Sequence, residues 1–472
     1  MIRTELKPLL DLLNNSIAID NHVTILDRQQ LQASIYRLAE ISALESGNRQ
    51  KLARYITRLT ALAFGTYPAS IQELYLARGR GEIPNTFTVP AMNLRMLSFD
   101  AARAVFRVAK SIDGAAFIFE IARSEIGYTD QRPSEYATNI LAAAIAEGYT
   151  GPVFIQGDHF QVSAKKYVNT PEAELQAVRD LITESIQAGF YNIDIDTSTL
   201  VDINKPTVAE QQITNCGLSA MFTAFIRELQ PSGIIISVGG EIGEVGGHNS
   251  TEQELRAYMD GYSHELKNIS PNSAGLSKVS IQTGTSHGGV VLPDGSIAQV
   301  AVDFDTLRAL SRIARAAYGM GGAVQHGAST LPDNAFGKFV EAEAIEVHLA
   351  TNFQNITFGL LPMALKNEMY RYLDEKNAAE RKPGMTDEQF YYKTRKNAIG
   401  PFKAQTWGLE PGIKESIFSA LETQFRKLFT YLGVQGTRDY VEKTIRQPTN
   451  QPALKDYLGS ESTEGDVSDL AD

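Results

Sequence analysis

Three of the seven histidines in this sequence, His159, His287 and His326, adjoin aspartate or glycine at or just past the ends of short apolar runs. Glu241 ends another such run. Because the histidines are 128 and 39 residues apart, they cannot form a local zinc-finger motif and meet only if the fold brings them together. Imidazoles with a carboxylate suit zinc or a related divalent transition metal, and three histidines leave one position open for substrate. These residues predict a catalytic metal site.

Glycine-rich loops flank the same residues. They read GGEIGEVGG (239–247), GTSHGG (284–289) and HGAS (326–329). Glycine lets backbone amides approach an anion closely, so these loops indicate phosphate binding next to the metal.

These residues need a fold in which the ends of several strands converge. After about residue 84, short apolar or β-branched runs alternate with amphipathic helical stretches, a pattern typical of βα units. Strands are predicted over 87–93, 114–122, 151–158, 191–196, 233–241, 279–285, 322–327 and 344–350, with helices over 98–112, 170–189, 212–229 and 303–319. Eight units over about 280 residues predict an α/β fold, a (β/α)8 TIM barrel with its chemistry at the C-terminal ends of the strands. An open doubly wound sheet is the alternative, but no GxGxxG follows the first run.

Both ends of the chain have helical spacing instead. We therefore expect a helical N-terminal extension (1–82), the barrel (83–361), a helical C-terminal extension (362–458) and a disordered acidic tail (459–472). Asp27 and Gln30 predict the start of one N-terminal helix by capping.

The composition narrows the range of partners and the expected compartment. Of 472 residues, 44 are Lys or Arg and 55 are Asp or Glu, a net charge of −11 that argues against nucleic acid or an anionic membrane as a partner. No apolar stretch reaches the roughly 18 residues that span a bilayer. The single cysteine, Cys216, cannot form an intrachain disulfide, which favours a cytoplasmic location and a structural role for its thiol.

Six segments, in order, resemble the class II, metal-dependent fructose-bisphosphate aldolase family. They are VPAMN (89–93), GDHF (157–160), IDTS (195–198), GEIG (240–243), GTSHG (284–288) and HGAS (326–329). The resemblance covers roughly residues 85–355 and leaves out both helical ends.

The resemblance implies a role for each matching residue. His159, His287 and His326 would bind zinc or another divalent transition metal, with Glu241 as an alternative ligand and Asp196 near a second metal position. Asp158 would be the acid/base. The residues implied to contact substrate or its phosphate are Gly288, Gly327, Ser329 and Thr351, with Asn93 of the first strand as a further candidate. A homo-oligomer is implied as well.

Retro-aldol cleavage accounts for these residue types. Breaking the C3–C4 bond of a ketose leaves an enediolate, which a zinc ion stabilises as a Lewis acid, while a carboxylate such as Asp158 accepts the hydroxyl proton. Asp158 could alternatively only orient His159. A Schiff-base lysine is the competing mechanism, but Lys278 is expected before its strand, and Lys165 and Lys166 lie in a polar loop.

The sequence departs from the family at two places. The family's mobile-loop glutamate is replaced by Asn249, which cannot act as a carboxylate base, and His248 beside it is a possible substitute. On the eighth strand the family's Asn-x-Asp-Thr-Asp reads His348, Leu349, Ala350, Thr351 and Asn352, which makes fructose 1,6-bisphosphate doubtful as the substrate. Lys396, Lys403 and Arg123 are candidates for a second cationic contact with substrate.

The leading hypothesis is a zinc-dependent, aldolase-type lyase of carbohydrate metabolism, such as glycolysis, that cleaves a ketose phosphate or bisphosphate. Loss of the loop glutamate leaves open an epimerase that breaks, rotates and remakes the same bond. A non-catalytic metal-binding barrel with an interaction role is the third alternative.

Overall fold

The computed structural model of the chain describes residues 2–20, 22–243, 248–284, 302–329, 331–448 and 452–458, with side chains from residue 6 onward. All statements below refer to these residues.

Eight parallel strands form a closed barrel. They are β4 (Val89–Asn93), β5 (Ile118–Ala122), β6 (Gly151–Gln161), β7 (Asn192–Asp196), β8 (Ser237–Glu241), β9 (Lys278–Ile281), β10 (Ala323–Gln325) and β11 (Glu346–Leu349). Each strand pairs with the next, and β11 pairs with β4 through Val347 and Pro90, which closes the sheet. Each of the eight predicted strands overlaps one of these, so the TIM-barrel prediction is confirmed.

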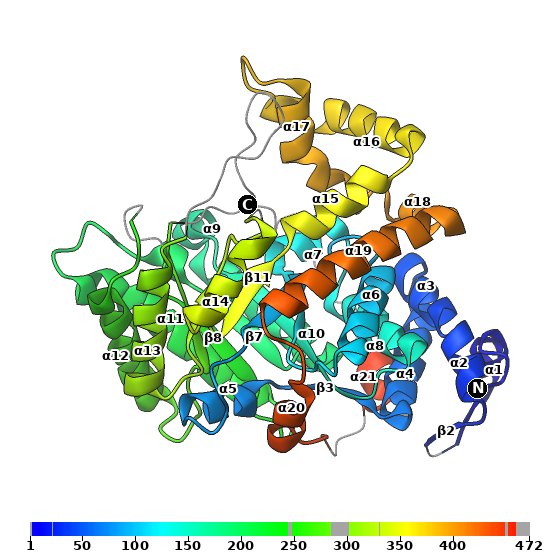
Figure 1. Cartoon of the computed structure of the whole chain (residues 1–472), viewed down its shortest axis with the longest axis horizontal. Helices are drawn as coiled ribbons and strands as arrows, with labels where there is room; N and C mark the ends of the chain where they lie inside the picture. Colours follow the sequence, from blue (N-terminus) through cyan, green and yellow to red (C-terminus); the bar gives the residue numbers. More distant parts are fainter. Residues whose placement is uncertain are drawn as a thin grey trace.

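Helices cover the outside of the barrel (Figure 1). They are α6 (Ser98–Ser111), α7 (Arg123–Thr129), α8 (Pro133–Glu147), α9 (Ala164–Asn169), α10 (Pro171–Ala188), α11 (Val208–Leu229), α12 (Glu252–Ile269), α13 (Phe304–Tyr318), α14 (Gly337–Glu341) and α15 (Thr351–Leu360), with short 3-10 turns η1 (Ser198–Leu200) and η2 (Asp333–Ala335). The four helices predicted between strands correspond to α6, α10, α11 and α13. Apart from α9, which has no buried residue, these helices bury apolar side chains. Glycines in the left-handed conformation end several of them, as Gly148 ends α8 and Gly189 ends α10.

The side chains of alternate strand residues point into the barrel interior, and many of them are polar. Gln156 of β6, Asp194 of β7, Lys278 of β9 and Glu346 of β11 are buried and bonded to one another there. Because side chains two apart on a strand point the same way, the residues two positions further along line the upper part of the same interior. Those residues are Asp158, Asp196, Ser280 and His348, and two of them, Asp158 and Asp196, are predicted site residues.

The N-terminal segment packs beside the barrel, mainly against α8. It contains α1 (Ile2–Leu12), β1 (Ile17–Ile19), β2 (Val23–Ile25), α2 (Arg28–Ser34), α3 (Tyr36–Leu44), α4 (Gly47–Phe64), β3 (Thr66–Ala69) and α5 (Gln72–Gly79). The Asp27 side chain accepts a hydrogen bond from the Gln30 amide and caps α2, as its sequence predicts. The three strands were not predicted, since runs of three or four residues are too short to show alternation. β3 pairs with β6 and so joins the barrel sheet from outside.

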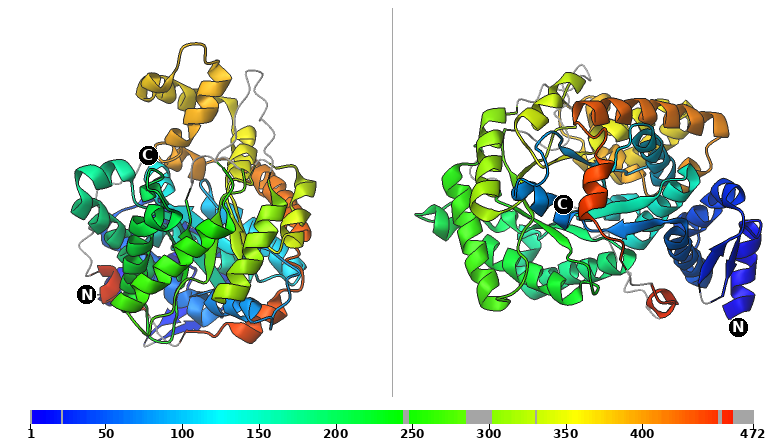
Figure 2. Two further views of the ribbon diagram at one scale, coloured as in Figure 1. Left: turned by 90° about the vertical axis from the view of Figure 1, so that its left-hand side faces the viewer. Right: turned by 60° about the horizontal axis from the view of Figure 1, so that its bottom comes forward.

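The C-terminal segment runs from one end of the barrel to the other. It contains α16 (Met363–Lys376), η3 (Ala378–Glu380), α17 (Asp387–Thr394), η4 (Arg395–Ala398), α18 (Lys403–Trp407), α19 (Pro411–Tyr431), α20 (Arg438–Thr444) and α21 (Lys455–Leu458). Helices α16 and α17 lie above the end of the barrel where α15 begins, and α20 lies at the opposite end (Figures 1 and 2). There the Thr437 hydroxyl accepts hydrogen bonds from the amides of Ala115 and Ala116, ahead of β5.

Two further expectations concern the tail and the membrane. The predicted acidic tail, 459–472, lies outside the described residues. Within the described ranges no helix is long and apolar enough to cross a membrane.

Candidate active site

His159 occupies an irregular point near the C-terminal end of β6. The register between β6 and β7 shifts between Gly157 and Phe160, and His159 has a φ of +41°, in the left-handed region that non-glycine residues rarely adopt. A Cβ on Gly157 would lie 2.3 Å from the Phe160 ring, so only glycine fits the bulge. The bulge turns both Asp158 and His159 toward the barrel mouth, and Asp158 Oδ1 lies 3.8 Å from His159 Nε2. Bulges and left-handed residues of this kind recur beside functional sites.

The structure brings His159, His326 and Glu241 together as predicted. His159 Nε2 lies 3.1 Å from His326 Nδ1, and His159 Nδ1 lies 3.1 Å from Glu241 Oε2. One potential ligand atom from each of the three residues falls within 4.8 Å of the others. Two imidazole nitrogens at this separation can both reach one ion at about 2.1 Å, so the donor set fits a divalent transition metal.

The second nitrogen of each imidazole already has a partner. His159 Nδ1 lies 3.2 Å from Asp196 Oδ2, and His326 Nε2 lies 2.9 Å from the Ser280 hydroxyl. Such partners fix the tautomer of a metal-binding histidine and leave its other nitrogen free for the ion. Asp196, predicted to lie near a second metal position, is in this structure a hydrogen-bond partner of His159.

The charge around His159 favours a cation. Burial lowers the pKa of His159, but the carboxylates of Asp158 and Glu241 outweigh burial and hold that pKa well above its usual range. Burial and the neighbouring Asp196 raise the pKa of Glu241. The three carboxylates thus create a negative site that a proton or a metal ion neutralises, and because a ligating imidazole is neutral, a metal must displace the proton.

Asp158 is held in place from two sides. Its Oδ2 accepts a hydrogen bond from Asn93 Nδ2 at 3.2 Å, and its Oδ1 lies 3.1 Å from His348 Nδ1. Asn93 also donates to Glu125 at 2.6 Å. Burial raises the pKa of Asp158, but His159 and His348 bring it well below its usual range, so the side chain is a carboxylate. Asn93 contacts the predicted acid/base, in addition to the substrate contact expected of it.

His348 connects the mouth to a charged interior that sequence reasoning missed. Its Nε2 lies 2.6 Å from Glu346 Oε1, and its Nδ1 lies 3.1 Å from Glu120 Oε1. The ring centroid of His348 is 4.0 Å from that of His326. Asp158, His326 and His348, and also Glu120, Glu346 and His348, are close enough to hold an ion between them. His348 is thus a buried histidine with carboxylate partners on both ring nitrogens.

Lys278 completes this interior network. Its ammonium donates to Glu346 at 2.5 Å, to Gln156 at 2.7 Å and to Asp194 at 2.9 Å. The prediction that Lys278 precedes its strand is wrong: β9 begins at this residue, which is fully buried. Its partners raise the pKa of Lys278 despite burial, so the amine is protonated and unsuited to a Schiff base. Burial raises the pKa of Asp194 to about 6 and that of Glu120 to about 8.

The predicted phosphate contacts lie where β10 and β11 end. Gly327 has a φ of +71°, the Ser329 hydroxyl accepts a hydrogen bond from the Ala350 amide at 2.8 Å, and Thr351 is the first residue of α15. Backbone amides at a helix start suit an anion. His287 and Gly288, the other predicted ligand and phosphate contact, lie outside the described residues.

In the loop after β8, residues 244–247 lie outside the described residues, and the two predicted proton-transfer candidates, His248 and Asn249, follow them. His248 is mostly exposed, with its Nδ1 2.8 Å from the Asn249 carbonyl oxygen and its Nε2 3.8 Å from Glu254. Asn249 Nδ2 donates to Asp303 at 2.9 Å. Neither side chain has a contact with His159 among the described residues, so their predicted catalytic role has no geometric support here.

Of the cationic candidates, two are already paired with carboxylates. Arg123 donates to both carboxylate oxygens of buried Glu174, and Lys403 pairs with Glu135 at 3.0 Å. Lys396 lies over the ring of Tyr128, 5.4 Å from its centroid. Cys216, predicted to be structural, is buried, and burial raises its thiol pKa to about 12.

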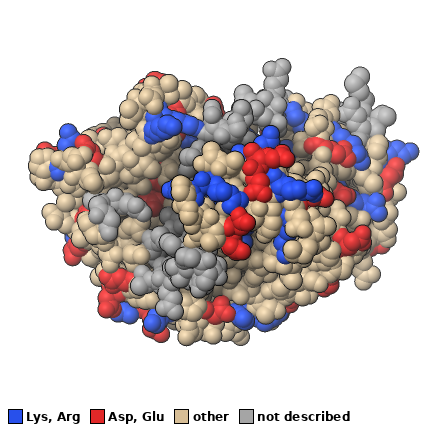
Figure 3. Space-filling model, turned by 90° about the horizontal axis from the view of Figure 1, so that it is seen from above, with Lys and Arg blue, Asp and Glu red and all other residues tan. Residues whose placement is uncertain are grey.

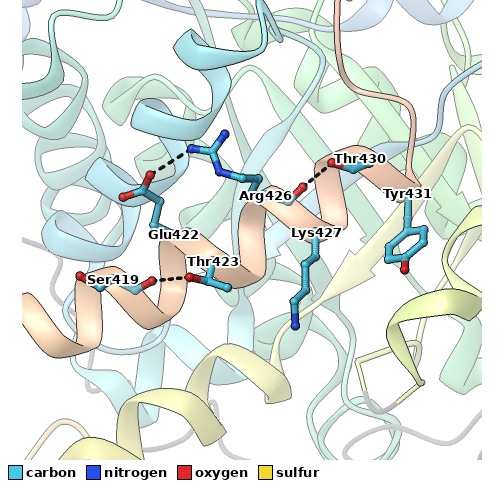
Figure 4. Close-up of a pocket in the computed structure, with 7 residues that line it drawn as sticks. All are labelled: Ser419, Glu422, Thr423, Arg426, Lys427, Thr430 and Tyr431. Carbon is cyan, nitrogen blue, oxygen red and sulfur yellow. Dashed lines mark hydrogen bonds and ion pairs between the residues drawn. The ribbon is translucent and has the colours of Figure 1, made fainter.

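A separate hollow of about 500 Å³ lies on α19, away from these residues (Figure 4). It is lined by Ser419, Glu422, Thr423, Arg426, Lys427, Thr430 and Tyr431. These residues form one exposed helix face, and its charged groups pair as Glu422 with Arg426 and Lys427 with Asp333. No histidine lines this hollow, so it lacks the imidazoles found at the barrel mouth.

A parallel barrel with imidazoles and carboxylates gathered at the C-terminal ends of its strands defines a TIM-barrel protein with a candidate metal site. The chain belongs to the class-II fructose-bisphosphate aldolase family, whose family model matches residues 83–405. This confirms the resemblance seen in the sequence. No curated protein sequence matches the chain.

Several solved structures are similar to this chain, and two with TM-scores above 0.5 support the fold. A fructuronate-tagaturonate epimerase from Cohnella laeviribosi is 12% identical with a TM-score of 0.54, over 89% of this chain and 90% of that one. A protein from Sinorhizobium meliloti described as a probable tagatose 6 phosphate kinase is 15% identical with a TM-score of 0.53, and the match covers 73% of this chain and 100% of that one. A fructose-bisphosphate aldolase from Campylobacter jejuni is 17% identical with a TM-score of 0.45, and the match covers 76% of this chain and 93% of that one.

Proposed function

We propose that this protein is a metal-dependent aldehyde-lyase that cleaves a ketose phosphate or bisphosphate by a retro-aldol reaction. One observation carries the proposal: His159 Nε2 and His326 Nδ1 face each other at 3.1 Å, with the Asp158 carboxylate 3.8 Å from His159 Nε2. A pair of metal-binding nitrogens and a carboxylate base side by side supply the two groups that this cleavage needs.

His159, His326 and Glu241 would hold the ion, and we expect His287 as a further ligand. Zinc is the expected metal, since nitrogen and carboxylate ligands suit it. When bound, the ion acts as a Lewis acid toward the ketone oxygen of the substrate. Asp196 and Ser280 keep the two imidazoles in orientation through their second nitrogens.

Asp158 would accept the proton of the hydroxyl group next to the bond that breaks. Asn93 and His348 hold its two oxygens in place, so the carboxylate is oriented before substrate arrives. Pre-organisation of this kind makes proton transfer efficient because no side chain must reorient during the reaction. Gly327, Ser329 and Thr351, with Gly288, would bind a phosphate of the substrate.

An epimerase is the second candidate, and the loop after β8 favours it. A lyase must protonate the three-carbon fragment before releasing it, whereas an epimerase rotates the aldehyde and remakes the bond. Asn249 cannot donate as a carboxylic acid would, and the His248 ring is bonded within its own loop. If neither of these two residues protonates the fragment, the reaction that releases no fragment is favoured.

Product analysis separates these candidates. Metal-loaded protein is incubated with ketohexoses, their phosphates and bisphosphates, and triose fragments and epimers are quantified. We expect Asp158→Asn to lower turnover roughly 10²- to 10⁴-fold with the metal retained, and His326→Ala to lose both metal and turnover. His264→Ala, at an exposed histidine of α12, is the control and should behave as wild type.

Each outcome has a distinct meaning. Triose fragments support the lyase, and epimers without free triose support the epimerase. Bound metal with no turnover on the whole panel would support the non-catalytic alternative. Cytoplasmic location, a homo-oligomer and a place in glycolysis stay predictions.

A further inference from the structure

Asn249, in the loop after β8, is bonded to the N-cap residue of α13. Its Nδ2 donates to Asp303 Oδ2 at 2.9 Å, and Asp303 Oδ1 accepts from the Thr306 amide at 3.0 Å as the cap of the helix. Hydrogen bonds from Thr306 and Asn249 hold the pKa of Asp303 below its usual range, so the side chain is a carboxylate. A hydrogen bond to a charged acceptor is stronger than one between neutral groups, so this contact fixes the loop at this point.

Two further contacts attach the same loop to the end of β9. The Ser250 amide donates to the Gln282 carbonyl oxygen at 2.8 Å, and the Ser250 hydroxyl accepts from the Gln282 amide at 2.9 Å. At the start of the loop, directly after Glu241, the Ile242 amide donates to the Ser280 carbonyl oxygen at 3.2 Å. The loop is thus held against β9 both where it leaves β8 and where it approaches α12.

Both ends of the loop lead through hydrogen bonds to His326. At the first end, the Ser280 hydroxyl lies 2.9 Å from His326 Nε2. At the second end, the Asp303 amide donates to the Thr283 carbonyl oxygen at 3.0 Å, and the Thr283 hydroxyl donates to Gln325 Oε1 at 2.5 Å. Gln325 Nε2 then donates to the His326 carbonyl oxygen at 2.7 Å. Thr283 and Gln325 are buried, where a hydrogen bond is stronger than in water.

An amide suits the contact with Asp303 better than a carboxylate does. An aspartate in place of Asn249 would set two like charges against each other across a 2.9 Å contact. Figure 3 shows basic and acidic side chains intermixed among the described residues of the face seen from above, so hydrogen bonds rather than a field of one sign hold this loop. The contact thus accounts for an amide at the position where the sequence resemblance places a glutamate.

We propose that Asn249 and Asp303 form a positioning pair that holds the ends of β8, β9 and β10 in register. The proposed metal ligands at two of these ends, Glu241 and His326, are thereby kept at the separation that one ion requires. Asn249 acts through Asp303 in this role and does not contact substrate or the reacting atoms. The role rests on the proposed function for the reaction that it serves, whereas its effect on metal binding is independent of that reaction.

A charge substitution at Asn249, followed by a reciprocal exchange, tests the pair. Asn249→Asp places two carboxylates against each other, and we expect metal affinity and kcat each to fall about 10-fold, with KM and the midpoint of urea unfolding little changed. Combining Asn249→Asp with Asp303→Asn exchanges the amide and the carboxylate. Because Asn caps a helix as well as Asp does, we expect the double variant to recover most of both losses. Competition with a fluorescent zinc chelator measures the affinity, and steady-state turnover of the ketose phosphates gives kcat and KM.

Asn377→Asp is the matched control. Asn377 Nδ2 donates to Glu380 at 2.8 Å in the C-terminal segment, outside the chain of hydrogen bonds that reaches His326, so metal affinity and kcat should match wild type. Wild-type affinity and kcat in Asn249→Asp, or losses that the reciprocal exchange does not recover, would overturn the positioning pair. A rise in triose release by Asn249→Asp would also overturn it, since the new carboxylate would then be transferring a proton.

Metal affinity separates the positioning pair from the proposed reaction. Affinity that falls in Asn249→Asp and returns in the double variant, in a protein that turns over no sugar of the panel, would support the pair and contradict the reaction. Turnover by wild type, with unaltered metal affinity and kcat in Asn249→Asp, would contradict the pair alone.

Discussion

His159 Nε2 and His326 Nδ1 lie 3.1 Å apart, although 167 residues separate the two histidines in the chain. Closure of the barrel brings β6 and β10 to the same mouth, and the bulge after Gly157 turns His159 inward. Since Asp196 and Glu241 contact the other nitrogen of His159 and Ser280 contacts that of His326, the facing pair is the one available to a metal ion.

The Ser280 hydroxyl is therefore expected to tune metal binding without touching the ion. Ser280→Ala removes the partner of His326 Nε2, and we expect the metal affinity to fall about 10- to 100-fold while the fold is kept. Competition with a fluorescent zinc chelator measures this change. Ser277→Ala, at a buried serine that bonds to Ser237 just before the same strand, should leave metal affinity unaltered. Equal affinities for the two variants would show that His326 needs no such partner.

Gly239 makes room for the buried ion pair inside the barrel. A Cβ at this position would lie 2.3 Å from Asp194 Oδ1 and 2.8 Å from Lys278 Cε, so Gly239→Ala must separate these two groups. Breaking a buried pair costs roughly 3–5 kcal/mol, and we expect a loss of that size in the free energy of unfolding by urea. Gly217→Ala in α11 is the control: a Cβ there meets nothing within 4 Å and should be neutral or slightly stabilising. A near-neutral Gly239→Ala would mean that the interior can rearrange.

Glu135 predicts a specific pH dependence of stability. Burial raises its pKa to about 7, even though Lys403 lies 3.0 Å away and opposes the shift. Because the folded-state pKa lies above the unfolded one, the group's stabilising contribution is full below about pH 4.5 and is lost as pH rises through 7. The contribution amounts to about 3 kcal/mol.

Glu135→Gln removes this titration. The free energy of unfolding of wild type minus that of Glu135→Gln should therefore fall by about 3 kcal/mol between pH 5 and pH 8.5. Urea unfolding at each pH measures this change. Glu388→Gln, at an exposed glutamate of α17, serves as reference and should differ from wild type by the same amount at every pH. A pH-independent difference for Glu135→Gln would contradict the argument.

The barrel and much of its site could be predicted from the sequence because both have local signals. Each strand is a short apolar run between helical stretches, and His159, Glu241 and His326 follow such runs directly. The charged interior could not be predicted in the same way. Glu120, Asp194 and Glu346 each interrupt an apolar run at an inward position, a signal that was present, but pairing them with Lys278 requires knowing the register of four strands.

The sequence contains no pattern that predicts the bulge between Gly157 and Phe160 or the strand β3. Whether Gly157 permits a turn of the backbone depends on the Phe160 ring that packs over it, which is a tertiary contact. β3 joins the sheet through four residues, too few for their periodicity to stand out.

Removing the metal tests the central claim most directly. The protein is stripped with a chelator, and turnover of the ketose phosphate panel is followed as zinc is added back, with bound metal quantified in the same samples. The proposed reaction predicts that cleavage or epimerisation disappears on stripping and returns in proportion to the zinc bound, and that His326→Ala recovers neither. Undiminished turnover in metal-free protein would contradict it.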